Sequence, residues 1–110
     1  MANILKVLGQ SNPGTTLTDL YVVPANAVAT VSSIIVAETG AGARTYRIAV
    51  RPLGAEVALK HYIFYDRALA ANDSDKHVVG LTLGAGDVVS VYGSSTDVSF
   101  SMFGVETRAL

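Results

Sequence analysis

Turn-forming residues divide this chain at short intervals, and that spacing constrains its fold more than any other feature. The turn signals are NPG at 12–14, PAN at 24–26, TGAG at 39–42, RPLG at 51–54, ANDSD at 71–75, LGAG at 83–86 and YGSST at 92–96. The segments between them are rich in Val, Ile, Thr, Tyr and Phe, which favour strands. No window keeps the apolar repeat of an α-helix. The pattern predicts an all-β, single-domain β-sandwich.

About eight strands are expected, and two of them show a clear alternation of apolar and polar side chains. The expected strands are 4–8, 16–23, 27–37, 44–51, 56–65, 78–83, 87–92 and 97–103. The side chains expected to face the core of the two clear strands are Tyr46, Ile48, Val50, Val98, Phe100 and Met102. Residues 66–72 would add at most one helical turn. Eight strands suit a jelly roll or a related Greek key.

The N-terminal segment, residues 1–14, is expected to be an edge strand or a projecting arm, and residues 15–110 the β-sandwich domain. The segment carries Ile4, Leu5, Val7 and Leu8, with Lys6 as its one charged side chain. It is too apolar to stay in water and too short to form its own core. It can extend its own sheet or pair with a neighbouring subunit by strand addition. We favour the second arrangement, because it suits a protein that locks an assembly.

Charged side chains are scarce, which bears on what covers the surface. They make up 15% of the chain, against about 25% in ordinary soluble domains. Between Val7 and Ala37 the only charged residue is Asp19. Partner subunits are the simplest cover for such a surface, so we expect a homo-oligomer and favour a trimer. The alternative is a neutral surface of Ser, Thr, Ala and Gly that stays exposed.

Three arginines, Arg44, Arg47 and Arg51, are predicted to form a basic stripe along one sheet face. The stripe either stays solvated and discourages aggregation, or pairs with carboxylates of another subunit. The carboxylates considered for this pairing are Glu38, Glu56 and Asp66.

The strand segment KHYIFY, 60–65, has two large and mostly apolar faces. Tyr62 and Phe64 share one face, and a loop or a neighbouring subunit must cover the other. The full set of subunit-interface candidates is Ile4, Leu5, Val7, Leu8, Arg47, Arg51, His61 and Tyr65.

Few residues suggest metal binding. The chain has no cysteine, which excludes disulfides, zinc–thiolate sites and thiol catalysis. His61 is expected to be packed or hydrogen-bonded, and His77 to be solvated. Asp73 and Asp75 have a spacing that occurs in calcium loops, but Lys76 follows where further oxygen ligands are needed. We therefore expect no metal.

Catalytic and nucleotide-binding motifs are equally weak. GAGA at 40–43 and GAGD at 84–87 lack the Lys-Ser/Thr ending of a phosphate loop. No GxSxG nucleophile motif occurs. The net charge of −1 and the lack of a basic–aromatic pattern argue against nucleic acid as a partner. No apolar stretch is long enough for a membrane helix. We therefore expect that the protein is not an enzyme, needs no cofactor, and binds neither nucleic acid nor a membrane.

Four segments together resemble a known family. They are TTLTDLYVVPANAVATVSSIIVAE at 15–38, TYRIAVRPLG at 45–54, KHYIFYDRALAAND at 60–73 and LTLGAGDVVSVYGSSTDVSFSMFGVE at 81–106. The combination resembles small virion structural proteins of tailed bacteriophages. The resemblance implies a non-enzymatic β-sandwich that is located in the virion and assembled in the bacterial host cytoplasm. Its partners would be the major capsid protein or other virion proteins.

Three functions remain open. The first, which we favour, is a capsid decoration or cement protein that stabilises the head through oligomeric contacts. The second is a component of the neck, tail or fibre base that contributes to host attachment. The third is a carbohydrate-binding module, which would need exposed aromatic side chains on one concave face. Here the aromatic residues mostly follow the parity of the core.

Overall fold

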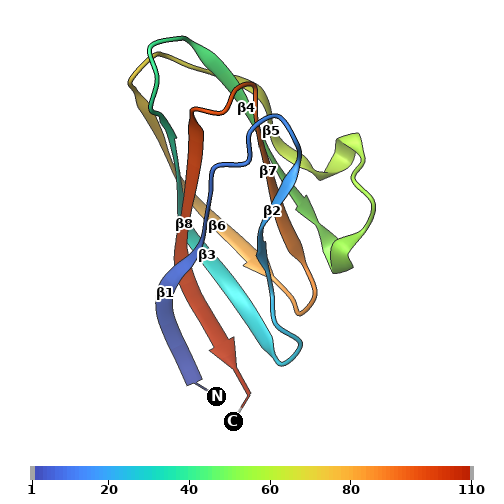
Figure 1. Ribbon diagram of the computed structural model, residues 1–110. Helices are drawn as coiled ribbons and strands as arrows, with labels where there is room; N and C mark the ends of the chain where they lie inside the picture. Colours follow the sequence, from blue (N-terminus) through green and yellow to red (C-terminus); the bar gives the residue numbers. More distant parts are fainter. Residues whose placement is uncertain (1, 110) are drawn as a thin grey trace.

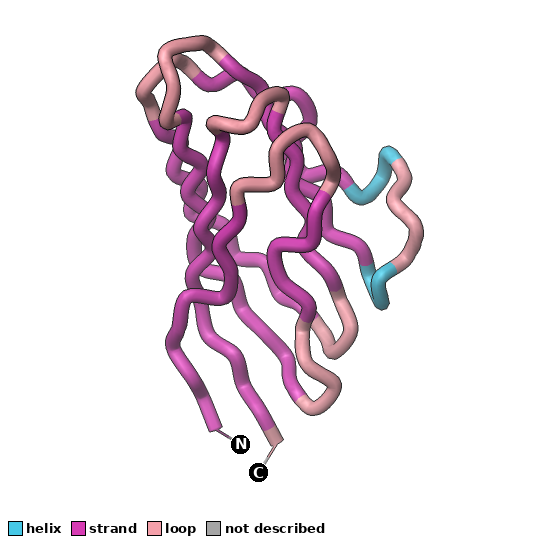
Figure 2. The backbone as a smooth tube through the Cα atoms, viewed as in Figure 1, coloured by secondary structure: helices cyan, strands magenta, loops and turns pink. Residues whose placement is uncertain are grey.

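The computed structural model describes residues 2–109 and is built from two antiparallel sheets of four strands each (Figure 1). The strands are β1 (Ala2–Ser11), β2 (Thr18–Val22), β3 (Ala27–Glu38), β4 (Arg44–Arg51), β5 (Tyr62–Leu69), β6 (Ser74–Leu83), β7 (Val88–Gly93) and β8 (Val98–Arg108). Two short 3₁₀ turns, η1 (Pro52–Gly54) and η2 (Leu59–His61), lie between β4 and β5 (Figure 2). The all-β sandwich predicted from the sequence is confirmed.

The strand order identifies the sandwich as a jelly roll. One sheet has the order β1-β8-β3-β6 and the other β2-β7-β4-β5. Within them β1 pairs with β8, β2 with β7, β3 with β6 and β4 with β5. These are the pairs of one long hairpin that is wound into two layers. The further pairings β3–β8 and β4–β7 connect these strand pairs into the two four-stranded sheets. Because β1 pairs with β8, the two ends of the chain lie side by side (Figure 1).

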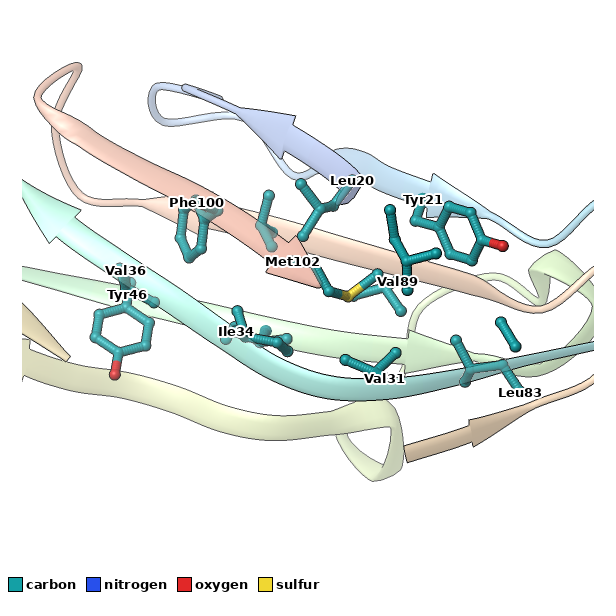
Figure 3. Packing of buried hydrophobic residues seen from close by; sticks show 14 of the residues in the cluster. Leu20, Tyr21, Val31, Ile34, Val36, Tyr46, Leu83, Val89, Phe100 and Met102 are labelled. Atoms are coloured by element: carbon teal, nitrogen blue, oxygen red, sulfur yellow. The ribbon is translucent and has the colours of Figure 1, made fainter. Parts of the chain in front are cut away.

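The core lies between the two sheets and is built from alternate residues of the strands. Along β3, Val31, Ile34 and Val36 are fully enclosed. The rings of Tyr46 and Phe100 meet edge to face with centroids 6.0 Å apart (Figure 3). The inward positions predicted for the two clear strands are confirmed. Val50 is partly buried, and the others are fully buried: Tyr46, Ile48, Val98, Phe100 and Met102.

The N-terminal strand takes the first of the two arrangements considered above, at the edge of its own sheet. Its register against β8 shifts between Val7 and Gly9, and Leu8 joins the core there. A Cβ atom at Gly9 would overlap the backbone carbonyl of Leu20 on β2. The absence of a side chain therefore lets β1 approach β2 and close this side of the sandwich.

The segment between β4 and β6 differs from its prediction. A strand was expected over 56–65, but β5 begins at Tyr62, after a loop with two turns. Residues 66–69 belong to the segment 66–72, where at most one helical turn was expected. They continue the strand instead, because Arg67 and Ala68 pair with β4. Asp66 adopts a left-handed conformation (φ 51°) where the pairing shifts. Finally, β6 begins at Ser74 instead of residue 78.

Candidate assembly interface

The outer face of the β1-β8-β3-β6 sheet is almost free of charge, and we call it the neutral face. Its outward positions are given by the alternation of each strand and by the pairing register. Among the described residues the one charged side chain at these positions is Lys76. The apolar members are Leu5, Val7, Val28, Ile35, Val78, Phe103 and Val105. The others are Ser, Thr, Asn, Gln, Ala or Gly.

Several apolar side chains of the neutral face are open to solvent. Leu5 is 79% exposed and Val78 is 84% exposed, and Val7 and Val28 are about half exposed. Along a strand of an antiparallel sheet, apolar and polar residues usually alternate, so that the solvated side of the sheet carries polar and charged side chains. A face with large exposed aliphatic groups and one lysine is therefore typical of a surface that another subunit covers.

The outer face of the other sheet is different, because its charges are matched within the chain. Arg47 donates to Asp66 through Nε at 2.6 Å. Its guanidinium lies 4.2 Å from the ring centroid of Tyr65 and 4.6 Å from that of Tyr92. The ion pair holds the pKa of Arg47 above its usual value. Arg47 is thus held by its own sheet.

The other two arginines are also paired inside the chain. Arg51 binds Asp19 at 2.8 Å and Ser90 at 3.1 Å. Arg44 binds Asp97 at 3.1 Å. The proposed inter-subunit pairing of the arginine stripe is therefore corrected. Asp66 had been considered as the partner of an arginine in a neighbouring subunit. It instead binds Arg47 of its own chain, at the irregularity in the pairing of β5 with β4.

Two glutamates are buried and have structural surroundings. Glu106, 1% exposed, accepts a hydrogen bond from Tyr21 at 2.5 Å and pairs with Arg108. The hydrogen bond from Tyr21, aided by Arg108, lowers the pKa of the Glu106 carboxyl despite its burial. Glu38 accepts from the backbone of Gly40 at 2.7 Å. Neither carboxylate is accessible to a substrate.

His77 was expected to be solvated, and that prediction is wrong. Because β6 begins at Ser74, His77 falls on the inward side of the strand and stacks on Phe64, with ring centroids 4.0 Å apart. Its Nε2 lies 2.6 Å from the hydroxyl of Tyr46, which also lies 2.6 Å from Asp75. Burial, followed by the charge of Arg67, lowers the pKa of His77. This cluster closes the β5–β6 side of the sandwich.

The weak metal and phosphate motifs have structural roles in turns. The Asp73 carboxylate accepts a hydrogen bond from the backbone of Ser74 at 2.8 Å. Asp87, at the end of GAGD, accepts from the backbone of Gly84 at 2.8 Å and of Leu53 at 2.9 Å. Across residues 2–109, no three His, Asp or Glu side chains are grouped for a metal ion and no pocket is present.

The predicted interface residues divide into enclosed and exposed groups. Leu8 and His61 are each 7% exposed, so both are corrected as contact candidates. His61 Nδ1 accepts a hydrogen bond from the backbone of Ala58 at 2.9 Å, which confirms its predicted hydrogen-bonded role. The remaining candidates outside the arginines keep exposed surface: Ile4, Leu5, Val7 and Tyr65.

Sequence reasoning missed Val28, Val78, Leu53 and Leu59 as exposed apolar residues. For Val78 a signal existed, because the alternation that places it outward begins at Ser74. The 78–83 strand was too short to show it. For Leu53 and Leu59 no local signal existed, since both lie in a segment interpreted as strand or turn.

Comparisons with known proteins give distant structural likenesses. No protein-family model matches the chain. No curated protein matches it either. A chain in the structure of infectious bursal disease virus, Gx strain, is 11% identical with a TM-score of 0.45 over 96% of this chain. A chain from the Gt strain is also 11% identical, with a TM-score of 0.43 over 96%. This chain spans 30% and 28% of their lengths. A shared backbone pattern at this level does not extend to function.

Within residues 2–109, no helix combines the length and the apolar character that crossing a bilayer requires.

Proposed function

We propose that this protein is a non-enzymatic structural subunit of a tailed-bacteriophage virion, most specifically a capsid decoration protein. The observation that carries the proposal is the neutral face, a whole sheet surface whose one charged side chain within residues 2–109 is Lys76. The assignment to a bacteriophage virion is supported by the resemblance of the four sequence segments to phage virion proteins.

The energetics of the neutral face favour permanent contact with protein. Covering apolar surface stabilises a complex by about 25 cal/mol per Å². Leu5 and Val78, 79% and 84% exposed, offer most of their surface for this. Because the face has almost no charge, covering it would desolvate few ionised groups. Both terms favour a subunit that stays bound in an assembly.

The non-enzymatic part of the proposal is supported by the surroundings of the titratable groups. Glu106 and Glu38 are enclosed and bound by their own chain. The Tyr46–His77–Asp75 cluster packs against Phe64 between the sheets. The carbohydrate-binding alternative is less well supported, since Tyr65 and Tyr92 hold Arg47 between them and form no free stacking platform.

The proposal is tested on purified particles by quantitative mass spectrometry. A decoration protein should be present in a number comparable to the major capsid protein, whereas a neck, tail or fibre-base component would be far less abundant. Absence from the particles would contradict a virion role.

A matched pair of variants tests the surface. Val78→Asp, on the neutral face, should reduce incorporation into particles. Val22→Asp changes a valine that is 51% exposed on the other sheet and should not. Equal incorporation of both variants would show that the neutral face is not the contact surface.

A further inference from the structure

The segment 52–61 between β4 and β5, which we call the projecting loop, stands out from the body of the sandwich (Figures 1 and 2). It carries two large apolar side chains at its surface. Leu53 is 80% exposed and Leu59 is 79% exposed. The two leucines give this protruding segment apolar surface that a partner would cover.

The projecting loop is held in one shape by contacts at several points. The backbone N–H of Leu53 donates to Asp87 Oδ1 at 2.9 Å, and Arg51 donates to the carbonyl oxygen of Ala55 at 2.9 Å. Leu53 itself has a left-handed backbone (φ 54°), which a leucine seldom adopts. A loop ordered in advance loses little conformational entropy when it binds. The leucines are thus presented outward in a fixed geometry.

The projecting loop and the neutral face complement each other in charge. Glu56 lies between the two leucines in sequence and is exposed. Lys76 is exposed on β6, at the outward position next to Val78. Among the ion pairs within residues 2–109, neither Glu56 nor Lys76 has a partner. The two groups are opposite in charge, so a contact between the projecting loop and the neutral face can pair them.

One molecule cannot make this contact with itself. The projecting loop leaves from the β2-β7-β4-β5 sheet, and the neutral face is the outer side of the opposite sheet. We propose that the projecting loop of one copy docks on the neutral face of a second copy, with Leu53 and Leu59 against Val78 and Glu56 beside Lys76. The inference rests on the proposed structural role and names the partner and both surfaces.

A head-to-tail contact explains more of the surface than face-to-face pairing does. Two neutral faces stacked on each other would leave Leu53 and Leu59 in water and Glu56 without a partner. Since a head-to-tail contact uses two different surfaces, it repeats until a ring closes or a filament grows. A closed ring agrees with the trimer favoured from the sequence.

The test is a mixing experiment followed by light scattering from micromolar to millimolar protein. The loop variant is Leu53→Asn with Leu59→Ser, since Asn tolerates a left-handed backbone. The face variant is Val78→Asp, and Val22→Asp is the control. Circular dichroism melting checks that each variant is folded, and Leu59→Ser alone serves if the double variant is not.

The proposal expects the wild type and the control to associate, and each test variant to associate about tenfold more weakly. An equimolar mixture of the two test variants should form dimers, because the face variant keeps an intact loop and the loop variant an intact face. A monomeric wild type, a loop variant that associates normally, or a mixture that stays monomeric would overturn it.

Charge reversal gives an independent measurement. Glu56→Lys and Lys76→Glu should each weaken association, and the double variant should recover it. Additive losses in the double variant would contradict the pairing of the two charges. These results do not depend on particles, so a failed self-contact is distinguishable from a failed virion role, which incorporation measures.

Discussion

The hydroxyl of Tyr21 on β2 donates a 2.5 Å hydrogen bond to the buried carboxylate of Glu106 on β8, joining the two sheets. Both side chains are almost fully enclosed. Burial, together with this bond to Glu106, raises the pKa of Tyr21, so the phenol stays protonated and the carboxylate ionised. The bond is a charge-assisted tie across the sandwich.

Tyr21→Phe should destabilise the fold by about 1–3 kcal/mol, because the Glu106 carboxylate would lose a buried hydrogen-bond donor. Urea unfolding at neutral pH measures this. The folded-state pKa of Glu106 is below its ordinary 4.5, so its stabilisation is present above that pH and lost as the pH falls through the folded value. The variant should show a weaker loss in acid than the wild type. An unchanged acid profile would argue against the tie.

His77 should make stability depend on pH in a higher window. Its folded-state pKa is below the ordinary 6.5, so the unfolded chain binds the proton more readily. Stability should therefore be complete above about pH 7 and decrease as the pH falls through 6.5. His77→Gln, which keeps a donor toward Tyr46, should remove this part of the profile. If the variant and the wild type lose stability in parallel from pH 7.5 to 5, the role of His77 is wrong.

Arg47→Lys should cost about 0.5–1 kcal/mol, although the charge is kept. The ammonium group cannot lie flat between Tyr65 and Tyr92 while it binds both Asp66 oxygens. Equilibrium unfolding of the variant, beside Lys60→Arg as an exposed control, measures the difference. A neutral result would mean that the stacking contributes nothing beyond the exposed ion pair.

Deletion of residues 1–12 should abolish cooperative melting, because β1 pairs along β8 and contributes Leu8 to the core. Leu8→Ala should cost about 2–4 kcal/mol for the same reason. Circular dichroism melting and light scattering are the measurements. A truncated chain that melts cooperatively but no longer associates would instead support the arrangement favoured from the sequence, in which this segment binds a neighbouring subunit.

The sequence by itself determined the fold class and the parity of the clearest strands. In 44–51 and 97–103 the alternation is local, since successive side chains of any strand point to opposite faces. Turn residues likewise act over a few positions, so most strand boundaries could be predicted to within a few residues. These rules place Tyr46 and Phe100 on the apolar side of their strands, and both are buried in the structure.

Tertiary structure decided whatever depends on partners far apart in sequence. Residues 66–69 became a strand only because β4 was available to pair with them. The arginine partners, the inward position of His77 and the bond between Tyr21 and Glu106 each depend on how the layers are stacked. The neutral face likewise emerges only when β1, β8, β3 and β6 are brought side by side. Local patterns set which residues share one side of a strand, but the packing of distant strands sets which side meets the core and which meets water.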